Sequence, residues 1–88
     1  MLKRHQVQFY MKQGCPLCDE AREVLHRLQG RFPITIQETD ITTDSVLHER
    51  YKTIVPVLII DRQFTLGARI EEDELRSYLL EIGDGDHT

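Results

Sequence analysis

Two cysteines separated by two residues are the part of this sequence best suited to chemistry. Cys15 and Cys18 are the only cysteines among the 88 residues, and such a pair at the start of a helix can exchange electrons with a disulfide. The free N–H groups and the partial positive charge of a helix N-terminus stabilise a thiolate on Cys15. Cys18, nearly one turn further on, is placed to resolve a mixed disulfide. The pair therefore predicts dithiol chemistry, with Cys15 as the nucleophile.

A zinc site is the main alternative for a Cys-x-x-Cys pair. A closed structural zinc site needs four ligands, and the remaining nitrogen ligands are His5, His26, His48 and His87. These histidines are scattered, and none forms a pair with the spacing of zinc ligands. We therefore favour dithiol chemistry and expect each histidine to be an exposed surface residue.

The elements around the cysteines are readable from hydrophobic periodicity. Apolar residues alternate with polar ones over 7–11, which predicts a strand with one face on the core. Gly14 breaks this pattern, and Pro16 suits the first turn of a helix because its missing N–H has no partner there. The helix then carries apolar residues at Leu17, Ala21, Val24, Leu25 and Leu28, and Gly30 is a plausible C-terminal stop.

The rest of the chain alternates strand-type and helix-type patterns. The expected elements are a strand over 34–37, a helix over 45–51 after a capping cluster, strands over 57–60 and 64–66, and a helix from 71 to 82. The acidic residues 71–73 suit the first turn of the last helix. Residues 83–88 are expected to form a flexible tail.

This order of elements, βαβαββα, predicts an α/β fold. The first two strands are joined through a helix and should be parallel, whereas the tight turn at Asp61 makes the last two antiparallel. We expect a four-stranded mixed sheet with helices on both faces. One domain should span residues 1–82, because a chain of this length buries only one core.

Composition excludes several classes of partner. The net charge is −4 and the isoelectric point is about 5.5, so we expect binding neither to nucleic acid nor to an anionic membrane. Hydrophobic residues make up 40% and charged residues 30% of the chain, as in globular domains. The first residues lack the apolar run of a signal peptide or a spanning helix. The expected location is the cytoplasm.

The order of the motifs resembles the glutaredoxin branch of the thioredoxin superfamily. The resemblance rests on Cys15-Pro16-Leu17-Cys18 after a strand, Val55-Pro56 before another strand, and Gly67 ahead of the final helix. It covers almost the entire chain. More narrowly, the sequence is similar to short glutaredoxin-like proteins of largely uncharacterised function. The residues that carry this narrower likeness are Cys-x-Leu-Cys-x-Glu-Ala at 15–21, Asp40-Ile41, Arg50-Tyr51 and Ile54-Val55-Pro56-Val57-Leu58.

The resemblance implies a thioredoxin-like fold and a substrate site. Pro56 would follow a cis peptide bond and lie against the cysteines, and Val55 would expose its backbone to an extended substrate. Lys12 would point to a glutathione carboxylate or to the thiolate. The other substrate-binding residues that the resemblance implies are Pro16, Leu17, Gly67 and Arg69.

The sequence also departs from typical glutaredoxins. Leu17 stands where they carry an aromatic residue, and Ala68 and Arg69 follow Gly67 in place of their second glycine and acidic cap. From its sequence context alone Pro56 would be an ordinary trans proline. Lys12 and Arg69 can equally be solvated loop residues.

We therefore predict a thiol-disulfide oxidoreductase that reduces protein or glutathione mixed disulfides. Glutathione or a reductase partner would supply the electrons, and we expect a monomer without a bound cofactor. Two alternatives remain open. One is a binding module that keeps the fold and the cysteines without catalysis, and the other is a metal or iron-sulfur carrier that uses Cys15 at a dimer interface.

Overall fold

Strands and helices alternate along residues 4–85, which are the part of the chain that the computed structural model describes. The elements are β1 (His5–Met11), α1 (Pro16–Gln29), β2 (Ile34–Asp40), a short 3₁₀ turn η1 (Ile41–Thr43), α2 (Ser45–Tyr51), β3 (Val57–Ile60), β4 (Phe64–Gly67) and α3 (Glu72–Gly85). The expected order of strands and helices is confirmed. The 3₁₀ turn and the greater length of β2 were not expected.

The four strands form one mixed sheet in the order β2-β1-β3-β4. β1 runs parallel to β2, with His5 opposite Ile34. β3 runs antiparallel to both of its neighbours, β1 and β4. The predicted α/β class and the predicted strand directions are therefore correct, and the loop after β1 lies at the same end of the sheet as the segment before β3.

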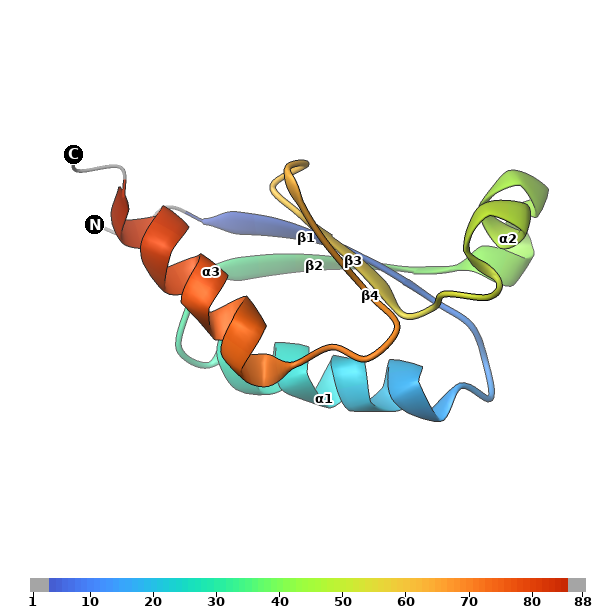
Figure 1. Cartoon of the computed structure of the whole chain (residues 1–88), viewed down its shortest axis with the longest axis horizontal. Helices are drawn as coiled ribbons and strands as arrows, with labels where there is room; N and C mark the ends of the chain where they lie inside the picture. The colour runs from blue at the N-terminus through green and yellow to red at the C-terminus, as the bar shows by residue number, and fades with distance from the viewer. Residues whose placement is uncertain (1–3, 86–88) are drawn as a thin grey trace.

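Helices contact both faces of the sheet (Figure 1). Every second side chain of β1 is buried, namely His5, Val7, Phe9 and Met11. Helices α1 and α3 pack on this face, where Leu25 and Leu79 join the same buried cluster. Tyr10 points to the opposite face and stacks on Tyr51 of α2, with ring centroids 4.9 Å apart. Because α2 is short, it covers only one end of this second face.

Helix α1 begins at the cysteines for local reasons. Cys15 is its N-cap in an extended conformation, and Pro16 follows at the first helical position. The buried side of the helix carries Cys18, Ala21, Val24, Leu25 and Leu28. Burying each leucine side chain contributes about 1.5–3 kcal/mol. The apolar stripe therefore fixes the helix on the sheet, and its first turn follows the end of β1, an interior strand.

Two aspartates shape the connection from β2 to α2. Asp40 accepts hydrogen bonds from the hydroxyl and the backbone N–H of Thr42, at 2.7 and 2.9 Å, and these bonds lower the pKa of the Asp40 carboxyl. Asp44 caps α2 by accepting from the N–H groups of Val46 and Leu47. The polar cluster before α2 is thus a pair of caps.

The expectation that His5 is exposed was wrong. Only 1% of His5 is accessible, and its Nδ1 lies 2.6 Å from Oδ2 of Asp61 in the turn between β3 and β4. Asp61 also accepts from the backbone N–H of Gln6 at 2.8 Å. His5 occupies the core-facing positions of β1, and the antiparallel pairing of β1 with β3 brings the aspartate to it. His26 is exposed as expected, His48 is partly buried, and His87 lies outside the described residues.

Helix α3 continues to Gly85, three residues beyond the predicted domain boundary at 82. Glycine costs only about 1 kcal/mol relative to alanine inside a helix, so Gly83 does not end α3. The remaining part of the expected tail, 86–88, lies outside the described residues. Among the helices of the described part, none is long and apolar enough to cross a membrane.

Candidate active site

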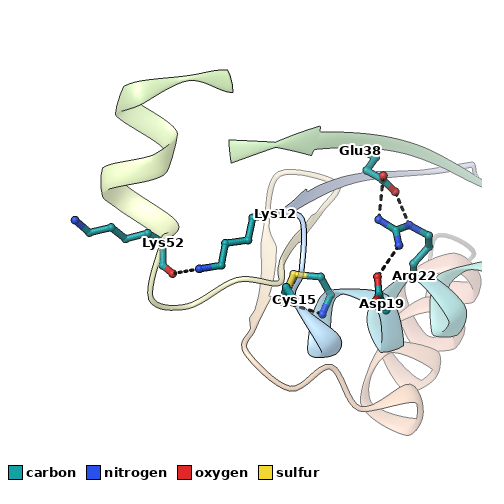
Figure 2. Close-up of a disulfide and its surroundings, with 7 residues drawn as sticks. Lys12, Cys15, Asp19, Arg22, Glu38 and Lys52 are labelled. Carbon is teal, nitrogen blue, oxygen red and sulfur yellow. Dashed lines mark hydrogen bonds and ion pairs between the residues drawn. A yellow bond between two sulfur atoms is a disulfide. The ribbon is translucent and has the colours of Figure 1, made fainter. Parts of the chain in front are cut away.

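The two cysteines form a disulfide at the start of α1. Their Cα atoms are 5.1 Å apart, and the sulfur of Cys15 accepts the backbone N–H of Cys18 at 3.1 Å (Figure 2). Cys18 is fully buried, with 0% of its surface accessible, whereas Cys15 is partly exposed. The structure therefore places a partly exposed cysteine at a helix N-terminus and a buried cysteine directly behind it.

The two residues between the cysteines have different surroundings. Pro16 is exposed, and Leu17 is partly buried. Both belong to the first turn of α1, directly after Cys15 in the chain.

Arg22 attaches the first turns of α1 to the sheet (Figure 2). Its guanidinium donates to Asp19 at 3.0 Å and binds Glu38 of β2 through two bonds of 3.0 and 3.1 Å. The hydrogen bond with Glu38 is the main reason that the pKa of Arg22 is raised. The guanidinium also lies 5.7 Å from the ring centre of Phe9. These contacts hold the helix that carries both cysteines.

Lys12 lies in the loop between β1 and Cys15. Its Nζ donates to the backbone carbonyl of Lys52, just after α2, across 3.5 Å. Figure 2 shows Lys12 extending from the side of Cys15 toward α2. Lys12 is partly buried. The structure thus brings this lysine to the cysteine end of the molecule and directs its ammonium to a helix C-terminus, where a positive charge is favoured.

The segment before β3 borders the same loop. Tyr10 of β1 pairs with Val57 of β3, so Val55 and Pro56 lie where the chain leaves β1 toward Cys15. The peptide bond between Val55 and Pro56 is cis, as the resemblance implied. Both residues are buried, and the N–H of Val55 donates to the carbonyl of Tyr51 at 3.0 Å.

The end of β4 completes this part of the structure. Gly67 pairs with Val57, and the next N–H, that of Ala68, donates to the carbonyls of Ile54 at 3.0 Å and Pro56 at 2.9 Å. Ala68 has a φ of 61°, a left-handed conformation that is uncommon for alanine. Sequence reasoning did not identify these two hydrogen bonds of Ala68 or its left-handed backbone, because an alanine carries no signal of such a conformation. Arg69 follows and is exposed.

Metal-binding groups are not gathered at the cysteines or elsewhere in the described residues. No three His, Cys, Asp or Glu side chains of this part of the chain lie close enough together to hold a metal ion.

The sequence matches a known family and a curated relative. Residues 6–80 match the model of the glutaredoxin-like domain (DUF836). The chain is 33% identical over 75 residues to a glutaredoxin-like protein YDR286C homolog of Dictyostelium discoideum, and the match covers 78% of this chain and 69% of that protein.

Solved structures share the fold. The protein XcR50 of X. campestris superposes with a TM-score of 0.70 at 27% identity, covering 83% of this chain and 93% of that chain. Protein Ne2328 of Nitrosomonas europaea gives 0.74 at 25% identity, with coverage of 90% and 95%. A mutant thioredoxin of Halobacterium salinarum gives 0.73 at 16% identity, with coverage of 91% and 75%, and shows the thioredoxin-like fold alone. The family match and the curated relative together establish that the chain belongs to the glutaredoxin-like (DUF836) family.

Proposed function

We propose that this protein is a thiol-disulfide oxidoreductase that reduces protein or glutathione mixed disulfides with the Cys15 and Cys18 dithiol. The observation that carries this proposal is the arrangement of the two sulfurs. Cys15 is accessible at the N-cap of α1 and accepts an N–H at 3.1 Å, while Cys18 is buried behind it and within bonding reach. A helix N-terminus favours the thiolate of the first cysteine.

The reaction proceeds in two exchanges. The Cys15 thiolate attacks one sulfur of the substrate disulfide, the substrate S–S bond breaks, and the departing thiolate takes up a proton. The thiol of Cys18 then loses its proton and attacks the sulfur of Cys15 in the mixed disulfide. The second substrate thiol leaves, and the Cys15–Cys18 disulfide forms. Two electrons have passed from the protein to the substrate, and an external dithiol or two thiols return them.

Both cysteines come from one chain, so the reaction requires no second copy, and we propose that the monomer is the active form. The dithiol must be reduced again after each turnover, which suits a reducing compartment such as the cytoplasm. No cofactor takes part in either exchange.

Trapping tests the order of the two steps. Cys18→Ser should accumulate a mixed disulfide between Cys15 and the substrate, because the resolving thiol is gone. Cys15→Ser should form none and should lose disulfide reduction. The double variant is the control for nonspecific capture, and mass spectrometry of non-reduced protein is the measurement. Equal residual turnover in the two single variants would refute the two-step mechanism.

The electron source is a separate proposal. The exposed Arg69 and the left-handed Ala68 occupy the positions of the glycine and acidic cap by which typical glutaredoxins bind glutathione. Losing one or two hydrogen bonds to a charged ligand costs about 1.5–3 kcal/mol each, which weakens affinity by about tenfold to several hundredfold or more. We propose weak activity with glutathione and faster reduction of a protein disulfide when a strong dithiol or a reductase partner supplies electrons.

Two assays on one preparation test the electron source. The first couples a small glutathione mixed disulfide to glutathione, and the second follows reduction of a protein disulfide by a dithiol. Fast turnover at physiological glutathione would overturn the proposed preference, and inactivity of the wild-type protein in both assays would favour the binding module over the enzyme.

A further inference from the structure

A cleft between the last turn of α1 and the first turns of α3 is lined mainly by arginines. Its volume is about 300 Å³. The lining residues are Arg27, Leu28, Arg31, Glu72 and Arg76. The end of α1 and the start of α3 lie side by side there (Figure 1). Most of α1, about 20 Å of helix, separates this cleft from Cys15, so the cleft is distinct from the dithiol site.

Two of the three guanidinium groups are held in place by carboxylates of α3. Arg27 donates to Oε1 of Glu72 from Nε at 3.1 Å and from Nη2 at 2.8 Å. Arg76 donates to Asp73 at 2.6 Å. A guanidinium has five N–H donors, so both arginines keep donors for a ligand. Because both pairs are exposed to solvent and therefore weak, an anion can also share or replace their bonds at little cost.

Arg31 brings a third guanidinium to the cleft from the turn after α1. Its backbone N–H donates to the carbonyl of Leu28 at 2.9 Å, which fixes this turn next to the helix. The side chain of Arg31 is exposed and has no hydrogen-bond or ion-pair partner among residues 4–80. The lining thus carries three positive charges against the single negative charge of Glu72, in a chain whose net charge is −4.

The charge and the donors of this lining match a phosphate monoester. Such a phosphate carries a charge of about −1.5 to −2 at neutral pH and three acceptor oxygens, and planar guanidinium groups bind these oxygens in pairs. A carboxylate has one charge and two oxygens, so it cannot engage three guanidinium groups equally well. The volume is at the lower end of the range for small-molecule sites, which is about 300–1,000 Å³. It therefore has room for a small organic group beside the phosphate.

We infer that this cleft binds the phosphate group of a small phosphate monoester, with Arg27, Arg31 and Arg76 as the donors. Binding includes no covalent step. The site lies apart from the two cysteines, so this inference goes beyond the proposed function and does not depend on it.

Titration of the ¹⁵N-labelled full chain, followed by two-dimensional NMR, tests the inference. The probes are glycerol 3-phosphate, inorganic phosphate and acetate, each added at neutral pH and at constant ionic strength. We expect both phosphates to cause saturable shifts of amides in 27–31 and 72–76, and acetate to cause none. Saturable binding of inorganic phosphate alone would overturn the assignment to monoesters. Equal binding of acetate, or shifts confined to other parts of the chain, would overturn the site.

Variants separate a built site from general attraction between charges. Arg31→Gln and Arg76→Gln should each weaken the binding of glycerol 3-phosphate by about tenfold, because each removes charge-assisted hydrogen bonds to the phosphate. Arg50→Gln, which alters an exposed arginine of α2, is the matched control with the same change in net charge and should leave the affinity within about twofold. The same spectra report whether each variant is folded. Equal effects of Arg31→Gln and Arg50→Gln would overturn the inference.

Discussion

The backbone N–H of Cys18 points to the sulfur of Cys15 from a distance of 3.1 Å. This donor, together with the other free N–H groups at the start of α1, would stabilise a thiolate on Cys15 in the reduced protein. Cys18 lies fully enclosed in the core cluster. One turn of helix thus gives two chemically similar thiols different accessibility and different electrostatic surroundings.

The two thiols should therefore differ in reactivity. In the reduced protein, iodoacetamide should modify Cys15 at least about tenfold faster than Cys18 near neutral pH, because thiolate content and exposure control alkylation. Rates are measured by mass spectrometry with site assignment, and Cys15→Ser supplies the reference rate for Cys18. Faster modification of Cys18 would exchange the roles that we assign to the two residues.

Lys12 should contribute to substrates that carry a carboxylate near the disulfide. A single contact of 3.5 Å with the Lys52 carbonyl holds its ammonium, so a ligand carboxylate can take its place. Lys12→Met should lower kcat/KM for a glutathione mixed disulfide by about three- to tenfold and leave a neutral disulfide unaffected. Lys52→Met is the matched control, because it removes a nearby exposed ammonium that pairs with Glu49. Equal effects of both variants would indicate only a loss of general positive charge.

The backbone of Ala68 should be strained. Its φ of 61° brings Cβ close to the backbone, at a cost of about 1–2 kcal/mol that glycine avoids. Because glycine also increases the entropy of the unfolded chain, Ala68→Gly should raise the free energy of unfolding by about 0.5–1 kcal/mol. Urea denaturation measures this. Ala21→Gly, a buried position within α1, is the control and should destabilise the protein. A lower stability of Ala68→Gly would contradict the prediction.

Tyr78 should make stability depend on alkaline pH. Its hydroxyl is buried and has no hydrogen-bond partner among the described residues, and burial, followed by the negative charge of Asp61, raises the pKa of Tyr78 above 10. The unfolded chain ionises this group near its ordinary pKa, so the folded state should lose stability as the pH rises above about 10. Tyr78→Phe keeps the stacking on Phe64, whose ring centroid is 4.4 Å away, and removes the ionisation. The unfolding free energy of the wild type minus that of Tyr78→Phe should be constant below pH 9. Above pH 10 this difference should fall, because only the wild type loses stability there. A difference that stays constant over the whole range would contradict the prediction.

Local patterns predicted the elements that local physics determines. The alternation from Val7 to Met11 identified β1, and the proline and glycine around 16–30 identified α1. The resemblance, and not the residue pattern, predicted the cis bond before Pro56. For β1 and α1 the signal lies within the element itself, whereas the signal for the cis bond is the order of motifs along almost the entire chain.

Contacts between distant segments were not predictable in this way. His5 is buried because Asp61, 56 positions away, reaches it across the sheet, although its place in the alternation with Val7 already indicated the core face. The two bonds from the N–H of Ala68 to the carbonyls of Ile54 and Pro56 depend on how β4 approaches the segment before β3. Such bonds follow from tertiary packing, so they are visible only once the chain is folded.

The direction of β1 separates the reactive end of the molecule from the ends of the described chain. β1 starts at His5 and finishes at Met11, a span of about 20 Å, and the turn with Cys15 follows at the far end. Figure 1 shows the start of β1 and the end of α3 on the left, and the start of α1 on the right. A polypeptide fused at either end, or a surface used for immobilisation, would therefore attach on the side opposite the cysteines. The cysteines would stay accessible in such a fusion.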